Sequence, residues 1–235
     1  MTGVQTCALP ISISSPYWVM AREVKANQRG GFDFVVSSNL GAAGSTSVEV
    51  SLQVPGKHNV RNALAVIAIV ELLGLSKEKA AQALGKFTGT GRRFQLRGEA
   101  HGITIIDDYA HHPTEIQATL AGARARYPKR RIWAVWQPHT YSRTQTLFLD
   151  FARAFKDADE VIVTEVYAAR EPKQDFTSAE IVSAMPHRSA RYIETLSEVT
   201  GHLLRNLKSG DVVIVMSAGD EIGRASCRER VYSSV

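Results

Sequence analysis

Acidic, aromatic and imidazole side chains are concentrated in residues 105–116 (IIDDYAHHPTEI), at the end of an apolar run and around a proline. Carboxylates and imidazoles can bind a metal ion, exchange protons or contact a nucleotide. Two adjacent histidines on an extended loop point apart, and neither a cysteine nor a His-x-x-x-His spacing accompanies them, so this segment alone does not predict a metal site. The acidic pair can alternatively begin a turn or cap a helix. The candidate residues are Asp107, Asp108, Tyr109, His111 and His112.

Further polar groups follow the next apolar runs, RIWAVW (residues 131–136) and EVIVTEV (residues 160–166). In a parallel sheet the carboxyl ends of the strands meet at one edge, where ligands bind. His139 and Arg143 can both contact one carboxylate, with the arginine supplying a bidentate fork. They can equally be a pair at a helix start that faces solvent. The groups at these strand ends are His139, Tyr141, Ser142, Arg143, Tyr167 and Arg170.

The elements that position these groups alternate between strand and helix from about residue 96 onwards. ITII (residues 103–106), RIWAVW, EVIVTEV and DVVIVM (residues 211–216) are short apolar strands. Helices are expected from Pro113, with Ile116, Leu120 and Ala123 on one face, and over Leu147, Phe151 and Phe155. Continuous apolar strands alternating with helices predict an α/β fold, with a mostly parallel, Rossmann-like sheet covered by helices on both faces.

The first part of the chain has a different pattern. FDFVV (residues 32–36) and SVEVSLQV (residues 47–54) alternate as strands do, and HNVRNALAVIAIVELLG then has helical spacing. The expected buried face of this helix is Ala63, Val66, Ile67, Val70 and Leu73. The boundary between the two parts is predicted near residues 94–98.

Two polar features of this first part and of its boundary suit a nucleotide. Asn59 and Asn62 lie one helical turn apart, and an amide offers the donor and acceptor that match an adenine edge. Asn59 can alternatively be only a helix N-cap. Arg92 and Arg93, in the glycine-rich GTGRR, can meet phosphates, although the chain contains no G-x-x-x-x-G-K-S/T phosphate-binding loop.

Composition excludes few classes of protein. The 235 residues are 44% hydrophobic and 22% charged, with a net charge of +5. The charge fits an anionic small substrate, while scattered lysines and arginines do not indicate nucleic-acid binding. No apolar run reaches the roughly 18 residues of a membrane span, so no membrane partner is expected.

The two cysteines, Cys7 and Cys227, lie in terminal segments that lack the patterns of the rest of the chain. Residues 1–12 and 221–235 resemble translated adapter sequences of the kind used in preparing sequencing libraries. We expect both segments to be extraneous, which would leave no native cysteine for disulfide or thiolate chemistry.

GKHNVRNALA, GTGRRFQ, DDYAHHPTEI, QPHTYSRT and DVVIVMSAGD together resemble the Mur ligase family, over roughly residues 13 to 220. The resemblance is closest to the members that join L-alanine to UDP-N-acetylmuramate in peptidoglycan synthesis. It implies a cytoplasmic enzyme that uses ATP and Mg²⁺ to convert a carboxylate into an acyl phosphate, which the amine of L-alanine attacks. It also implies that residues 13–95 are the C-terminal part of a central ATP-binding domain and residues 96–220 a C-terminal ligase domain.

The resemblance implies roles for residues that match the family motifs. Asn59 and Asn62 are expected to contact the adenine, Arg93 the ATP phosphates, and Asp108 the ribose. The residues expected to bind the amino-acid substrate are Tyr109, His111, His139 and Arg143. Arg93 and His139 are the catalytic candidates, and no metal ligand is assigned. Thr140 stands where many members have an arginine, which puts one cationic contact in doubt.

Other parts of the family pattern are missing from this sequence. The family has a further uridine-nucleotide-binding domain, a phosphate-binding loop and the main magnesium ligands, none of which is found here. The polypeptide alone is therefore expected to lack ligase activity. Alternatives are a related ligase that adds a peptide or another amino acid, a dinucleotide-binding module and a metal-dependent hydrolase. The dinucleotide module would need a G-x-G-x-x-G turn, which is absent.

Overall fold

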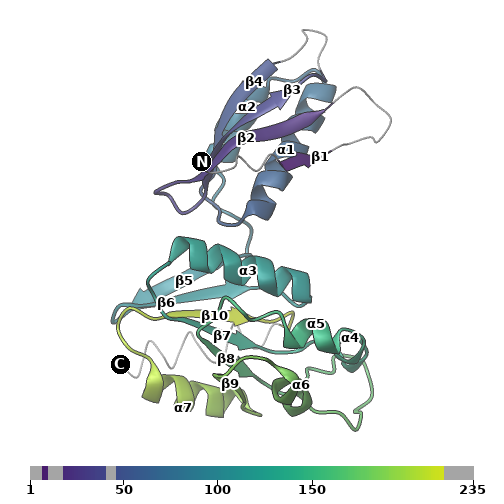
Figure 1. Ribbon diagram of the computed structural model, residues 1–235, viewed down its shortest axis with the longest axis vertical. Helices are drawn as coiled ribbons and strands as arrows, with labels where there is room; N and C mark the ends of the chain where they lie inside the picture. The colour runs from purple at the N-terminus through teal and green to yellow at the C-terminus, as the bar shows by residue number, and fades with distance from the viewer. Residues whose placement is uncertain (1–6, 10–17, 41–45, 220–235) are drawn as a thin grey trace. The chain divides into compact units, whose positions relative to one another are not determined.

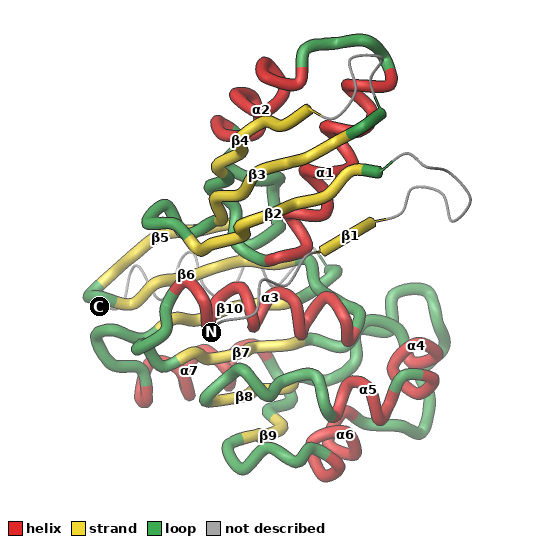
Figure 2. Tube along the Cα trace, turned by 45° about the horizontal axis from the view of Figure 1, so that its top comes forward, coloured by secondary structure: helices red, strands yellow, loops and turns green. Residues whose placement is uncertain are grey.

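The computed structural model describes residues 7–9, 18–40 and 46–219, and the chain divides into two compact units, Met1–Gly89 and Thr90–Val235 (Figures 1 and 2). The division falls a few residues before the expected boundary at 94–98, because the loop that carries Arg92 is bonded to the second unit. Of the two terminal segments expected to be extraneous, only Cys7–Leu9 is described, and the rest lies outside the described residues. No described helix has the length and hydropathy needed to cross a bilayer.

The first unit is an antiparallel sheet with two helices packed against it. Its strands pair in the order β1-β2-β3-β4. Alternating residues of β3, such as Phe34 and Val36, join Leu64 and Ile67 in a buried apolar core, as expected for a strand with one covered face. The elements are β1 (Cys7–Leu9), β2 (Val19–Ala26), β3 (Phe32–Ser38), β4 (Thr46–Ser51), α1 (Lys57–Leu72) and α2 (Lys77–Lys86).

Helix α1 buries a different stripe from the one its sequence predicted. Val66 is 40% exposed and Leu73, just past the helix, is 67% exposed, so both were wrongly placed in the core. Because α1 is apolar on more than one side, periodicity could not choose between neighbouring stripes. The buried residues are Val60, Ala63, Leu64, Ile67 and Ala68.

The second unit contains the predicted sheet. Its six strands lie in the order β5-β6-β10-β7-β8-β9, and every neighbouring pair is parallel except β5 with β6. The prediction of a mostly parallel α/β sheet is confirmed. The last of the described strands, β10, lies in the middle, between β6 and β7. The strands are β5 (Gln95–Ala100), β6 (Ile103–Asp108), β7 (Ile132–Trp136), β8 (Glu160–Val163), β9 (Ala190–Tyr192) and β10 (Val212–Met216).

Helices cover both faces of this sheet (Figure 1). Ile116, Leu120 and Ala123 of α3 are fully buried in one core cluster, as predicted, and α7 packs into the cluster on the other face. The helix expected over Leu147–Phe155 is shorter than predicted and covers Phe148–Ala152, yet Phe151 still stacks on Trp136 with ring centroids 4.6 Å apart. The helices are α3 (Pro113–Arg126), α4 (Tyr141–Thr146), α5 (Phe148–Ala152), α6 (Ser178–Ala184) and α7 (Leu196–Asn206).

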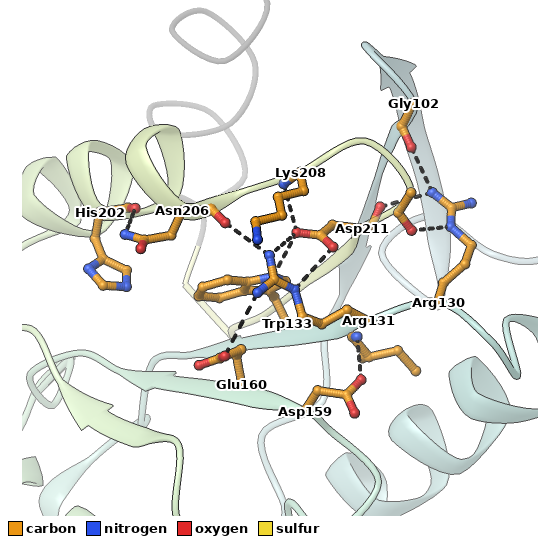
Figure 3. A network of polar contacts seen from close by, with 12 residues as sticks. Gly102, Arg130, Arg131, Trp133, Asp159, Glu160, His202, Asn206, Lys208 and Asp211 are labelled. Carbon is orange, nitrogen blue, oxygen red and sulfur yellow. Dashed lines mark hydrogen bonds and ion pairs between the residues drawn. The ribbon is translucent and has the colours of Figure 1, made fainter.

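A polar network fastens the amino-terminal ends of the central strands (Figure 3). Asp211, which precedes β10 and is only 4% exposed, accepts two hydrogen bonds from the Arg131 guanidinium, at 2.6 and 3.1 Å. The Trp133 indole and the backbone N–H of Lys208 also donate to Asp211, at 3.1 and 2.9 Å. Arg130 donates to the carbonyls of Gly102, Gly210 and Asp211. The network therefore ties β10 to β7 and to the turn between β5 and β6.

We predict that Asp211→Asn lowers the free energy of unfolding of the second unit by about 2–3 kcal/mol at pH 7, because a buried charge-assisted pair is lost. Partial burial alone would raise the Asp211 pKa, but Arg131, Lys208 and Trp133 together hold it below the ordinary value of 3.8. The stabilisation is therefore complete above that value and is lost as the pH falls through the folded pKa. Thermal unfolding at pH 7 and pH 3 checks this.

The difference in stability between the two proteins should be smaller at pH 3 than at pH 7. Asp175→Asn, at an exposed position, is the matched control and should unfold as the wild type does at both pH values. An equal loss of stability at pH 7 and pH 3 would contradict the role of the Asp211 charge.

Candidate functional site at the carboxyl ends of the strands

The acidic pair belongs to the end of a strand, and a histidine caps the helix that follows. Asp107 and Asp108 pair with Val215 and Met216 of β10. Neither caps the next helix, but Asp108 does begin a turn, because its carboxylate accepts the N–H of Ala110 two residues on. The N-cap of α3 is His112, whose Nδ1 accepts the N–H of Thr114 at 3.3 Å. His112 thus has a structural role as the helix cap, and Pro113 occupies the first helical position.

Asp108 is buried and braces two loops. Its carboxylate accepts the backbone N–H of Phe94 at 2.7 Å and that of Ala110 at 2.8 Å, and the residue is 4% exposed. Burial raises the pKa of Asp108, and these hydrogen bonds oppose the rise. The carboxylate thereby joins the loop before β5 to the loop after β6. Its predicted contact with a nucleotide ribose stays a prediction.

Arg92 is committed to contacts within the second unit. Its guanidinium donates to the carbonyls of Ser217 and Gly219, at 2.8 and 2.7 Å, and lies 5.0 Å from the centre of the Tyr109 ring. These contacts lock the loops before β5, after β6 and after β10 together. Both Arg92 and Arg93 were candidates for phosphate binding from the sequence. Of the two side chains, that of Arg93 is the more exposed, at 49% against 24% for Arg92.

Arg93 lies between two residues with left-handed backbone, Arg92 (φ 57°) and Phe94 (φ 50°), and its side chain is 49% exposed. Its guanidinium is 3.3 Å from a carboxylate oxygen of Glu115 and 5.5 Å from the centre of the Tyr109 ring. The other oxygen of Glu115 accepts a hydrogen bond from the backbone N–H of His111 at 3.1 Å and lies 3.4 Å from the ring nitrogen Nδ1 of His111. Glu115 therefore links Arg93 to His111, a link that the sequence analysis missed.

Four rings form a row across three strand-end loops. The centroid separations are 5.1 Å for Tyr109–His111, 6.3 Å for His111–His139 and 5.7 Å for His139–Tyr167. Arg143, on α4, places a guanidinium nitrogen 3.4 Å from His139 Nδ1. The structure thus brings together the four residues that the resemblance assigned to the amino-acid substrate, although their roles remain predictions.

The electrostatics of His139 favour its neutral form. Partial burial, then the positive charge of Arg143, then His111, lower the pKa of His139 below its ordinary value of 6.5, against a smaller opposing effect of Glu171. A neutral imidazole at pH 7 can accept a proton or a hydrogen bond.

A carboxylate distant in sequence holds the start of α4. Thr140, with φ 66°, is the N-cap but makes no capping bond with its side chain. Glu171 instead accepts both the backbone N–H (3.0 Å) and the hydroxyl of Ser142. Since Ser142 and Glu171 are 29 residues apart, no local pattern could have identified this cap. It fixes the first turn of α4, from which Arg143 projects.

Asn59 and Asn62 belong to the first unit. The N-cap of α1 is Gly56, so the alternative that Asn59 is only an N-cap is wrong. The Asn59 amide donates to the Pro55 carbonyl at 2.7 Å, and the Asn62 amide donates to Asn59 Oδ1 at 3.2 Å. Their predicted adenine contacts stay a prediction.

The described residues include no group of three or more histidine, cysteine, aspartate or glutamate side chains arranged to hold a metal ion.

We predict that substitution of the two adjacent arginines lowers the free energy of unfolding by unequal amounts. Arg92→Gln should lower the free energy of unfolding of the second unit by about 1–3 kcal/mol, since two carbonyls lose a charged donor. Arg93→Gln, at a largely exposed ion pair, should cost less than about 1 kcal/mol. Urea unfolding followed by tryptophan fluorescence measures both, because Trp133 and Trp136 report on the second unit. Equal losses for the two variants would contradict the assignment.

We also predict that Arg143→Gln raises the pKa of His139, because a nearby positive charge that disfavours the imidazolium is removed. NMR titration of the histidine ring protons measures this, with the His139 signals assigned from a His139→Asn variant. Arg153→Gln, at an exposed arginine just after α5, is the control and should leave the pKa unchanged. A His139 pKa unaffected by loss of Arg143 would show that the two side chains are not coupled.

Comparison with known proteins gives one consistent result. The family model described as Mur ligase, glutamate ligase domain, matches residues 92–219, more than half of the chain. A UDP-N-acetylmuramate–L-alanine ligase of Salinibacter ruber is 48% identical over 181 residues, which are 75% of this chain and 38% of that protein.

Solved structures agree. A UDP-N-acetylmuramate–alanine ligase of Thermotoga maritima has a TM-score of 0.71 and 33% identity, covering 88% of this chain and 44% of that one. A murein peptide ligase of Psychrobacter arcticus has a TM-score of 0.61 and 28% identity, covering 93% and 42%. The chain spans about two fifths of the length of the curated relatives it matches. By its match over the second unit, the chain belongs to the Mur ligase family.

Proposed function

We propose that this chain is part of a ligase that joins L-alanine to the carboxylate of UDP-N-acetylmuramate, with ATP and Mg²⁺, in the cytoplasmic stage of peptidoglycan synthesis. The observation that carries the proposal is the Arg143–His139 pair, in which the guanidinium lies beside an interior member of the row of rings. A guanidinium beside a neutral imidazole suits a small zwitterion, since the arginine binds the carboxylate and the imidazole faces the amine.

Each residue then has a physical task. A carboxylate is a poor electrophile, and phosphoryl transfer from ATP converts it into an acyl phosphate with a good leaving group. Arg93 stabilises phosphate charge, and Arg143 holds the alanine carboxylate so that the amine is oriented. His139 takes one proton from the alanine ammonium, and the amine nitrogen bonds to the acyl carbon. The phosphate departs with the electrons of the broken C–O bond and takes the second amine proton, leaving as hydrogen phosphate. Asn59, Asn62 and Asp108 bind the nucleoside.

A second candidate is a ligase that attaches a preformed peptide. The structural likeness to the murein peptide ligase of Psychrobacter arcticus favours it. The sequence identities to the L-alanine ligases, 48% for that of Salinibacter ruber, favour the first. A direct measurement of substrate choice separates the two.

A hybrid ligase provides that test. In the Salinibacter ruber protein, the matching segment is replaced by the aligned segment of this chain, which is 75% of its length. ADP release should require both UDP-N-acetylmuramate and L-alanine. Arg143→Gln should raise the KM for L-alanine about 10- to 100-fold, the effect of losing a charge-assisted pair of about 1.5–3 kcal/mol, with little change in the KM for ATP.

Two controls accompany the hybrid. Arg153→Gln should behave as the unaltered hybrid does. The 235-residue chain by itself should release no ADP, because its sequence lacks a phosphate-binding loop. Faster ligation of a tripeptide than of L-alanine would favour the second candidate, and alanine-dependent ADP release by the chain alone would contradict the predicted inactivity.

A further inference from the structure

Tyr167 ends the row of rings and has no role assigned by family resemblance. It follows β8, and its aromatic ring lies 5.7 Å from that of His139, at an interplanar angle of 36°. The residue is 38% exposed, although Val166 directly before it is buried. A large ring left accessible at the carboxyl edge of the sheet is placed to meet a ligand.

Backbone bonds fix the position of Tyr167. Its N–H donates to the Pro138 carbonyl at 2.9 Å, and its carbonyl accepts the Thr140 N–H at 2.9 Å. The loops after β7 and β8 therefore continue the parallel pairing beyond the strands, through the bridge between His139 and Tyr167. The backbone of Tyr167 is thus positioned by the same pairing that positions His139, and the two rings lie side by side.

The loop after β10 approaches the same ring. A Cβ added to Gly219 would lie 3.8 Å from Cδ1 of Tyr167, so the glycine backbone passes close to the ring. The Gly219 carbonyl accepts a hydrogen bond from Arg92. Tyr167 thus faces His139 and approaches a fixed stretch of backbone at Gly219.

The reach of an amino acid makes Tyr167 relevant. A carboxylate held by Arg143 places the amino-acid Cα one bond away and its Cβ two bonds away, and each bond is about 1.5 Å. Arg143 is 3.4 Å from the His139 ring, and Tyr167 is the next ring along. A side chain two bonds from the carboxylate is within reach of the two rings that flank His139, those of His111 and Tyr167.

We propose that the ring of Tyr167 is a wall of the amino-acid site that limits the substrate side chain to about the size of a methyl group. This rests on the proposed function, in that an amino-acid carboxylate binds Arg143. Tyr167 is a specificity-determining residue that excludes bulk, and it takes no part in proton transfer.

Two substitutions of opposite size test the wall in the hybrid ligase. Tyr167→Ala should raise kcat/KM for L-valine relative to L-alanine by about tenfold or more, as expected when space for extra methyl groups is opened. Tyr167→Trp should lower kcat/KM for L-alanine relative to glycine. Tyr167→Phe should preserve both ratios, because the ring is retained.

Tyr127→Ala is the control for loss of a tyrosine ring, since Tyr127 ends α3 and lies outside the row of rings. Unchanged ratios, within twofold, in both the alanine and the tryptophan variants would overturn the proposal, whatever happens to absolute rates. If Tyr167→Ala proves unstable in thermal unfolding, the tryptophan variant decides. An unaltered hybrid that prefers another amino acid would overturn the proposed substrate, and the ratios between amino acids would still decide the role of Tyr167.

Discussion

The insertion of β10 between β6 and β7 is the constraint on which the second unit depends. Met216 lies opposite both Asp108 and Trp136, so the three strands end level and their loops meet at one edge. At the other end of the same strands, the buried Asp211 forms an ion pair with the half-buried Arg131. The sheet therefore carries this ion pair at its amino-terminal edge and the row of rings at the opposite edge.

Local patterns in the sequence predicted the strands, helix α3 and the gathering of polar groups at the strand ends, because each depends on short-range periodicity and on the general geometry of parallel sheets. The central position of β10 could not be predicted, since its partners β6 and β7 precede it by about 80 to 110 residues. The residues of an apolar strand do not specify which other strands it pairs with. The same limit applies to Ser142 and Glu171. The error on α1 has another cause, namely an apolar surface wider than one stripe.

Arg92 and Arg93 show how adjacent residues of one type acquire different tasks. Left-handed backbone at Arg92 and Phe94 turns the two guanidinium groups into different surroundings, at a conformational cost that non-glycine residues bear only when neighbouring contacts hold them. Asp108 supplies such a contact at the Phe94 N–H. The composition of a loop therefore says little about which of its charges is available to a ligand.

Glu115 has a consequence for how the two ends of the site communicate. One carboxylate contacts Arg93 through one oxygen and His111 through the other. A phosphate that draws Arg93 away from Glu115 would leave the carboxylate to interact with His111 alone. A ligand at His111 would in turn change the free energy of phosphate binding at Arg93 by the same amount, because such coupling is reciprocal. Two binding events can thus be linked through a single side chain within one helical turn, without any rearrangement of the sheet.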